Sequence, residues 1–234
     1  MTAKNPRRPD RPPTLEAGDL HRYSGPLWRI HRSVGAHRME WNGLREYGPL
    51  PQFRWEPHPP PLQHHPGIGV SYTATNYVRA LAKVFQERRA ITLTGQHVLT
   101  AWLPSRTLEL LDLGGNYGAV HHGASASRPG APTSTCRNWA ASIYAELGTQ
   151  IDGLYVPSTA TGDTVTVLFA RAATAFPLAP GFSRPLTHVS VEKLALNAAD
   201  TLRWPIRWAG GPDKSLLGPH EIGRPENRAA FVDS

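Results

Sequence analysis

Apolar residues recur at helical spacing in two stretches of the chain. Residues 76–89 follow Thr75, a candidate N-cap, and residues 136–147 end before Gly148, a residue typical of helix ends. Both stretches are therefore predicted to be amphipathic helices. The side chains expected to point inward are Tyr77, Leu81, Val84 and Phe85 in the first helix and Cys136, Trp139, Ala140, Ile143 and Leu147 in the second.

Short apolar runs around these helices predict strands. The clearest is 164–170, where Val165, Val167 and Phe169 alternate with other residues. The other predicted strands cover residues 27–31, 70–74, 97–103, 107–113 and 154–157. Because two helices are embedded among short strands without regular alternation of strand and helix, the predicted fold class is α+β rather than a doubly wound sheet.

The chain of 234 residues contains 21 glycines and 23 prolines, too many for long helices to dominate. Its length suits one domain with dispensable ends. Residues 1–20 are predicted to be a disordered, basic, proline-rich arm and residues 209–234 a flexible tail, which leaves a folded domain over 21–208. Residues 55–67 are predicted to be a loop, because three consecutive prolines exclude a helix interior and a central strand.

The formal net charge of +7 favours anionic partners. The basic arm lacks interleaved aromatic residues and any recognised motif, so direct binding of nucleic acid is not expected. The single cysteine excludes an intrachain disulfide framework. Residues 1–13 lack the apolar core of a signal peptide, and the longest apolar stretch, 165–176, is too short to cross a membrane. We therefore expect a soluble, cytoplasmic protein without membrane contact.

Common catalytic and nucleotide-binding motifs are absent. The glycines at 67–69 and 114–118 lack the remaining residues of a Rossmann turn or a P-loop. Ser158 does not lie in a G-x-S-x-G turn, and Cys136 lies on an apolar helix face, where a core thiol is expected rather than a nucleophile. The adjacent histidines at 64–65 and 121–122 point in different directions and have no suitably spaced carboxylate, so no metal site is expected.

Several short segments, taken in order, resemble the RES domain family. They are residues 27–31 (LWRIH), 53–55 (FRW), 69–74 (GVSYTA), 80–82 (ALA), 108–113 (LELLDL), 135–140 (TCRNWA), 152–158 (DGLYVPS) and 167–169 (VLF). The resemblance spans residues 25–175 and rests on the shared order and spacing, because each segment is short. It implies a single RES domain with a fold like that of ADP-ribosyltransferase toxins, which is a split β-core with flanking helices and an NAD⁺ cleft.

The resemblance also implies an activity. Members of the family degrade NAD⁺, and we expect hydrolysis or phosphorolysis of its nicotinamide glycosidic bond. NAD⁺ is then the substrate, inorganic phosphate is a candidate co-substrate, and no further cofactor is expected. The characterised relatives are toxins, so the implied protein partner is an Xre-like helix-turn-helix antitoxin.

Four residues take binding roles by this resemblance. Arg29 and Arg54 would clamp the pyrophosphate of NAD⁺, because guanidinium groups suit bidentate contacts with phosphate oxygens. Tyr72 matches an aromatic position that faces the nicotinamide. Ser134 matches a pocket serine of some relatives, with capping of the second helix as an equal alternative. In addition, Ser158 matches the serine of the family's Pro-Ser motif and is a candidate catalytic residue.

This chain departs from the family pattern at the family's glutamate, because Lys83 occupies that position. Glycosidic cleavage passes through an oxocarbenium-like state, which a carboxylate stabilises and a cation opposes. Glu87, displaced by roughly 5 Å along the helix, is a candidate substitute. Two hypotheses follow: an enzyme in which Arg29, Lys83, Glu87 and Ser158 act in catalysis, or a catalytically impaired RES fold that binds a nucleotide or an antitoxin.

Overall fold

Eight strands form one mixed sheet in the computed structural model, which describes residues 9, 12–16, 18–114, 131–157 and 164–209. They are β1 (Leu20–Tyr23), β8 (Leu108–Asp112), β9 (Gly153–Pro157), β10 (Thr164–Phe169), β5 (Val70–Ala74), β2 (Leu27–Arg32), β7 (His97–Trp102) and β11 (Phe182–Pro185), in their order across the sheet. Neighbouring strands are antiparallel except β8 and β9, which are parallel. Two small pairs lie outside this sheet: β12 (Ile206–Trp208) with β6 (Ile91–Leu93), and β3 (Tyr47–Gly48) with β4 (Gln63–His64).

Each of the six predicted strands is present, with ends that differ from the predicted ones by at most one residue. Together with the helices they confirm the α+β class. Most of the predicted arm (1–20) and all but the first residue of the predicted tail (209–234) lie outside the described residues. The histidine pair at 121–122 lies outside them as well. In the part of the chain that the structure describes, no group of three metal-ligating side chains gathers, and no helix has the length and hydropathy to span a bilayer.

Both predicted helices form, with corrections at their ends. The first, α1 (Tyr77–Phe85), is capped by Asn76 rather than Thr75, because the Asn76 side chain accepts a hydrogen bond from the Arg79 amide. The second, α2 (Thr133–Leu147), has Pro132 at its N-cap position and no side-chain cap. Sequence analysis missed α3 (Val189–Leu202) and the 3₁₀ helix η3 (Ala170–Ala175).

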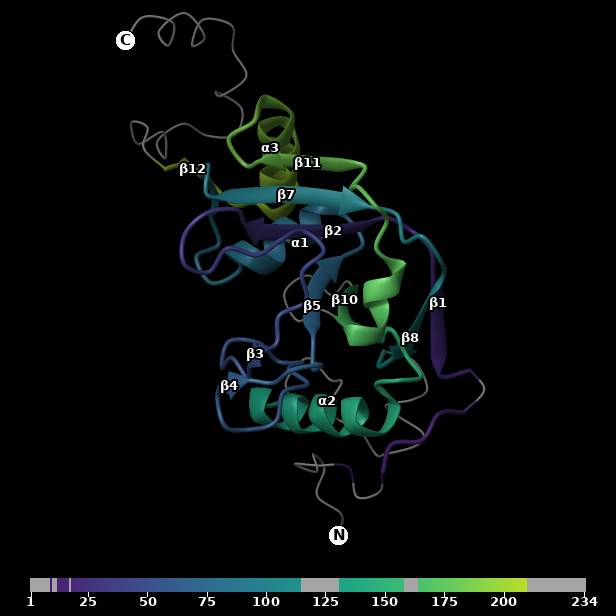
Figure 1. The fold of residues 1–234 in the computed structure, drawn as a ribbon. Helices are drawn as coiled ribbons and strands as arrows, with labels where there is room; N and C mark the ends of the chain where they lie inside the picture. The colour runs from purple at the N-terminus through teal and green to yellow at the C-terminus, as the bar shows by residue number, and fades with distance from the viewer. Residues whose placement is uncertain (1–8, 10–11, 17, 115–130, 158–163, 210–234) are drawn as a thin grey trace, which may run out of the picture.

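The helices cover different parts of the sheet, and Figure 1 shows α2 far from α1 and α3. All five inward residues predicted for α2 are buried, and they pack on β8, β9 and β10. In α1, Leu81 and Phe85 are buried against α3 and β7, as predicted. Val84 is 43% exposed, so its predicted inward position was wrong.

The sheet changes direction between β5 and β2. Among the described residues these strands pair only at Trp28 and Ala74, whereas β5 pairs with β10, and β2 with β7, along their lengths. Figure 1 shows β5 running away from β2 rather than alongside it. The backbone of Arg45 takes the free position beside β5, where it exchanges two hydrogen bonds with Val70. The two strands therefore diverge, and the space between them is available to side chains and ligands.

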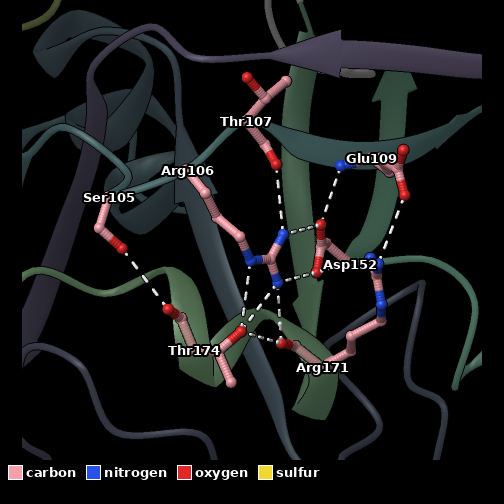
Figure 2. Close-up of polar contacts among 7 residues, drawn as sticks. All are labelled: Ser105, Arg106, Thr107, Glu109, Asp152, Arg171 and Thr174. Carbon is pink, nitrogen blue, oxygen red and sulfur yellow. Dashed lines mark hydrogen bonds and ion pairs between the residues drawn. The ribbon is translucent and has the colours of Figure 1, made fainter.

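A buried carboxylate joins the starts of β8 and β9 to η3 (Figure 2). Asp152 is fully buried and accepts two hydrogen bonds of 2.7 Å from Arg106 and one of 2.9 Å from the Glu109 amide. Arg171 lies 3.0 Å away as a second cation. Burial raises the pKa of Asp152, but the hydrogen bonds from Arg106 and Glu109 and the charges of both arginines outweigh it and lower this pKa.

The lowered pKa predicts how stability depends on pH. A carboxyl whose pKa is lower in the folded state stabilises the protein above its unfolded pKa, about 3.9, and loses that effect as pH falls further. Asp152→Asn should therefore lower the free energy of unfolding at pH 7 by about 1–3 kcal/mol. The loss is limited because water can partly solvate the charges of the two arginines once their counter-ion is removed. The difference from wild type should shrink as urea titrations move below pH 4. Asp200→Asn, at an exposed helix position, is the control, and a difference that stays constant down to acid pH would contradict the ion-pair account.

Candidate functional site

A cleft of about 400 Å³ lies where β2 and β5 diverge, and α1 forms its far wall. Four of the residues singled out from the sequence line it together: Arg29 from β2, Tyr72 from β5, and Lys83 and Glu87 from α1 and the turn after it. The loop between β2 and β5 adds Arg45 and Phe53. The cleft therefore combines cations and aromatic rings, with Glu87 as its acidic lining residue among the described ones.

Arg29 is a fixed cation in this cleft. Its Nη1 donates hydrogen bonds to the carbonyl oxygens of Trp41, at 3.0 Å, and Gly43, at 2.7 Å. Its Nε and Nη2 donate none to any described residue, so they are available to a ligand. Burial and the nearby charge of Arg45 lower the pKa of Arg29 to about 10, so the group stays protonated at neutral pH. Two free donors on a held guanidinium form a suitable site for phosphate oxygens.

Two stacked rings form the aromatic wall. The rings of Phe53 and Tyr72 are 4.6 Å apart and inclined by 21°. Arg45 Cζ lies 5.3 Å from the centre of the Phe53 ring, and Lys83 Nζ lies 6.0 Å from the centre of the Tyr72 ring. Both distances fall within the range of cation–π contacts. A planar base in the cleft would thus meet aromatic rings that already have cations beside them.

Glu56 is a buried residue behind this wall that sequence analysis missed. Its carboxylate is fully buried and accepts hydrogen bonds from Arg45, from His58 Nδ1 at 3.0 Å and from Tyr72 Oη at 3.4 Å. Burial raises the pKa of Glu56, but the hydrogen bonds from His58 and Arg45 outweigh it and lower this pKa. Glu56 therefore stays ionised and anchors Arg45 and Tyr72, two of the lining residues. The available signal was an acidic residue two positions before a histidine in a proline-rich segment.

The phenol of Tyr72 remains neutral in this setting. Burial and the negative charge of Glu56 raise the pKa of Tyr72 well above its ordinary value. The protonated hydroxyl can then donate to the carboxylate of Glu56 behind it. The Tyr72 ring is thereby held in place as a flat wall, and its hydroxyl is directed away from a ligand.

Lys83, like Arg29, is a cation of the cleft without an acidic partner among the described residues. It forms no hydrogen bond or ion pair with any described residue, Glu87 included, although Glu87 lies one helical turn away. Burial and the positive charge of Arg54 lower the pKa of Lys83. Glu87 itself is exposed at the rim of the cleft. The positive charge of Lys83 is therefore left for a ligand to balance.

The RES domain family model matches residues 26–189, which is most of the chain and includes every lining residue. The chain belongs to the RES domain family. Among solved structures, the crystal structure of the M. tuberculosis MbcT–MbcA toxin–antitoxin complex is similar, with a TM-score of 0.48 and 21% identity over 75% of this chain and 91% of that chain. No curated protein has a significant sequence match to this chain.

Within this RES domain, Arg54 takes a different place from Arg29. Its Nη2 donates a hydrogen bond of 3.0 Å to the carbonyl of Ala131 and lies 3.3 Å from Sγ of Cys136. Arg54 is not among the residues that line the cleft. Its Nη2 atom is directed toward the start of α2, while its charge acts on Lys83 in the cleft, and its role as a clamp of the pyrophosphate stays a prediction. Cys136 is fully buried, as predicted, but has a cation beside it that the sequence did not indicate.

Of the two candidate serines, only Ser134 lies among the described residues, and it does not line the cleft. Ser134 is exposed in the first turn of α2 and is neither the N-cap nor part of the cleft lining. Ser158 lies outside the described residues, directly after β9. The predicted site residues that line the cleft of the RES domain are therefore Arg29, Tyr72, Lys83 and Glu87.

Proposed function

We propose that this RES domain degrades NAD⁺ as a toxin-like enzyme, by cleaving the nicotinamide glycosidic bond with water or phosphate as acceptor. The observation that carries this proposal is the convergence on one cleft of Arg29, of Tyr72, of Lys83 from α1 and of Glu87 from the turn after α1. Arg29 lies on β2, far in the sequence from Tyr72 on β5 and from α1. The family resemblance singled out Arg29, Tyr72 and Lys83, and Glu87 was singled out by its place one helical turn after Lys83. NAD⁺ is the substrate in this proposal, and no further cofactor is required.

Each lining residue has a role in the proposed reaction. The free Nε and Nη2 of Arg29 would bind the pyrophosphate, and the face of Tyr72 would support the nicotinamide ring. The ribose carbon becomes positively charged as the bond to nicotinamide breaks, so a nearby carboxylate accelerates the step. Lys83 stands where the family has that carboxylate, and Glu87 is the carboxylate that remains at the rim.

A second candidate function follows from Lys83. A cation in place of the carboxylate opposes the transition state while leaving the binding of anionic groups intact. The alternative is therefore a catalytically impaired RES fold that binds a nucleotide or an antitoxin. For either function, family membership supports an Xre-like antitoxin as the protein partner. Binding of NAD⁺ without its consumption would favour the second function over the first.

Replacing Arg29 is the direct test of the proposed function. Arg29→Ala should weaken NAD⁺ binding at least tenfold and lower its consumption, because charged hydrogen bonds contribute about 1.5–3 kcal/mol. Binding is measured by calorimetry, and consumption by chromatography with and without phosphate. Arg32→Ala is the matched control, since Arg32 lies on the same strand but is exposed and bound to Gln96. The proposal would be overturned if Arg29→Ala and Arg32→Ala lost NAD⁺ binding and consumption equally, or if wild type did not bind NAD⁺.

A further inference from the structure

The position of Lys83 restricts which base can lie on the aromatic wall. Phe53 covers one face of the Tyr72 ring, with ring centres 4.6 Å apart. A ligand's ring can therefore stack only on the part of the Tyr72 ring that Phe53 leaves uncovered. Lys83 Nζ lies over the same Tyr72 ring at 6.0 Å. A planar base that stacks on Tyr72 must therefore lie close to the ammonium group of Lys83.

The surroundings of Lys83 leave its charge unbalanced. The positive charge of Arg54 acts on Lys83, and two further cations, Arg29 and Arg45, line the same cleft; Arg45 is already paired with Glu56. Glu87, the acidic lining residue of the described part, forms no ion pair with Lys83. A half-buried ammonium group without a partner is costly unless a ligand supplies negative charge. The structure thus assigns an anionic group of the ligand to the position beside Tyr72.

NAD⁺ does not offer such a group at its base. Its oxidised nicotinamide ring carries a positive charge on the ring nitrogen and a neutral carboxamide. The deamidated dinucleotide carries a carboxylate at the same ring position, and ionised partners form shorter and stronger hydrogen bonds than neutral ones. The ring nitrogen is positively charged in both dinucleotides, so Lys83 would repel the nicotinamide ring, whereas it would pair with the carboxylate of the deamidated ring.

We propose that this cleft prefers a pyridine dinucleotide whose ring carries a carboxylate, the deamidated form of NAD⁺, and that Lys83 determines this preference. The inference rests on the proposed function and narrows its substrate. The reaction is otherwise unchanged: the bond between the ribose carbon and the pyridine nitrogen breaks, and its electron pair leaves with the pyridine. Water adds its oxygen to that carbon and releases a proton, or phosphate adds one of its oxygens. The departing pyridine carboxylate stays paired with Lys83.

Competing substrates test the preference. With purified full-length protein, kcat/KM is measured for NAD⁺ and for deamidated NAD⁺ from the release of nicotinamide and nicotinate. Wild type should favour the deamidated form by at least about tenfold, as expected for one charge-assisted hydrogen bond. Lys83→Gln should bring the ratio close to one, and Lys83→Glu should reverse it. Lys193→Gln, at an exposed position of α3, should keep the wild-type ratio.

The outcomes separate this inference from the proposed function. If turnover is slow, the ratio of the two dissociation constants replaces the ratio of kcat/KM. If both dinucleotides are consumed or bound with a ratio near one in wild type, and Lys83→Gln leaves it unchanged, the preference is refuted and the proposed function stands. If neither dinucleotide is bound or consumed by wild type or Lys83→Glu, both proposals are refuted.

Discussion

Lys83→Glu is expected to raise the rate of NAD⁺ consumption by up to about four powers of ten. The substitution places a carboxylate, which the family resemblance assigns to this position, inside a cleft that already holds Arg29 and Tyr72. For charges about 5 Å apart in a medium of effective dielectric constant about 20, one unit interaction amounts to roughly 3 kcal/mol. Exchanging repulsion for attraction at the reacting ribose therefore changes the barrier by up to about 6 kcal/mol, and solvent screening reduces this value.

One consumption assay on four proteins reads out this prediction. They are wild type, Lys83→Glu, the same variant combined with Arg29→Ala, and Glu87→Ala, each with and without phosphate. Arg29→Ala should abolish the gain of Lys83→Glu, because the gained carboxylate acts only on bound NAD⁺. The prediction is wrong if wild type is already active, Glu87→Ala removes that activity and Lys83→Glu changes little. Glu87 would then be the carboxylate that serves the reaction.

Glu56→Ala should lower the free energy of unfolding by about 3–5 kcal/mol, the largest stability effect that we expect from one substitution. The side chain of Glu56 is fully buried, and that of its partner Arg45 is only 16% exposed. Removing the carboxylate leaves the Arg45 guanidinium nearly buried without its counter-ion and takes the acceptor from His58 and Tyr72. Urea denaturation at neutral pH measures the loss.

The matched control is Glu146→Ala on α2, because that side chain is exposed. Exposed charges contribute little to stability, so this variant should stay within about 0.5 kcal/mol of wild type. If Glu56→Ala lost no more stability than Glu146→Ala, the buried network would not stabilise the fold. Glu56→Gln keeps the side-chain volume and one acceptor oxygen, so its loss in free energy of unfolding should lie between those of Glu56→Ala and Glu146→Ala.

The pattern of apolar residues was sufficient where structure depends on neighbours along the chain. The alternation at 164–170 predicts β10, and the spacing from Cys136 to Leu147 predicts the buried face of α2, because burial of one face of a strand or helix imposes its own period. The same reasoning missed α3, whose buried residues are Val191 and three alanines. Alanine is a weak apolar signal, so that helix depends on the surfaces it packs against.

The residues of the site likewise fall into two groups: those that the sequence singled out and those that only the folded structure revealed. The order of short motifs singled out Arg29, Tyr72 and Lys83, and helical spacing from Lys83 added Glu87. Glu56 escaped, since its importance comes from Arg45 and Tyr72, which lie 11 and 16 residues away and meet it only in the folded protein. The direction of Arg54 was likewise decided by Ala131 and Cys136, about 80 residues later in the chain.

The sequence by itself determined the α+β class, six strands and two helices, and its family resemblance led to four of the residues that line the cleft. Only the tertiary structure decided that β2 and β5 diverge after a single pair, and this divergence creates the cleft. It also decided that Lys83 lies over the Tyr72 ring and forms no ion pair with any described residue. The physical reason is that periodicity records which face of an element is buried, whereas the meeting of charges and rings depends on contacts between distant segments.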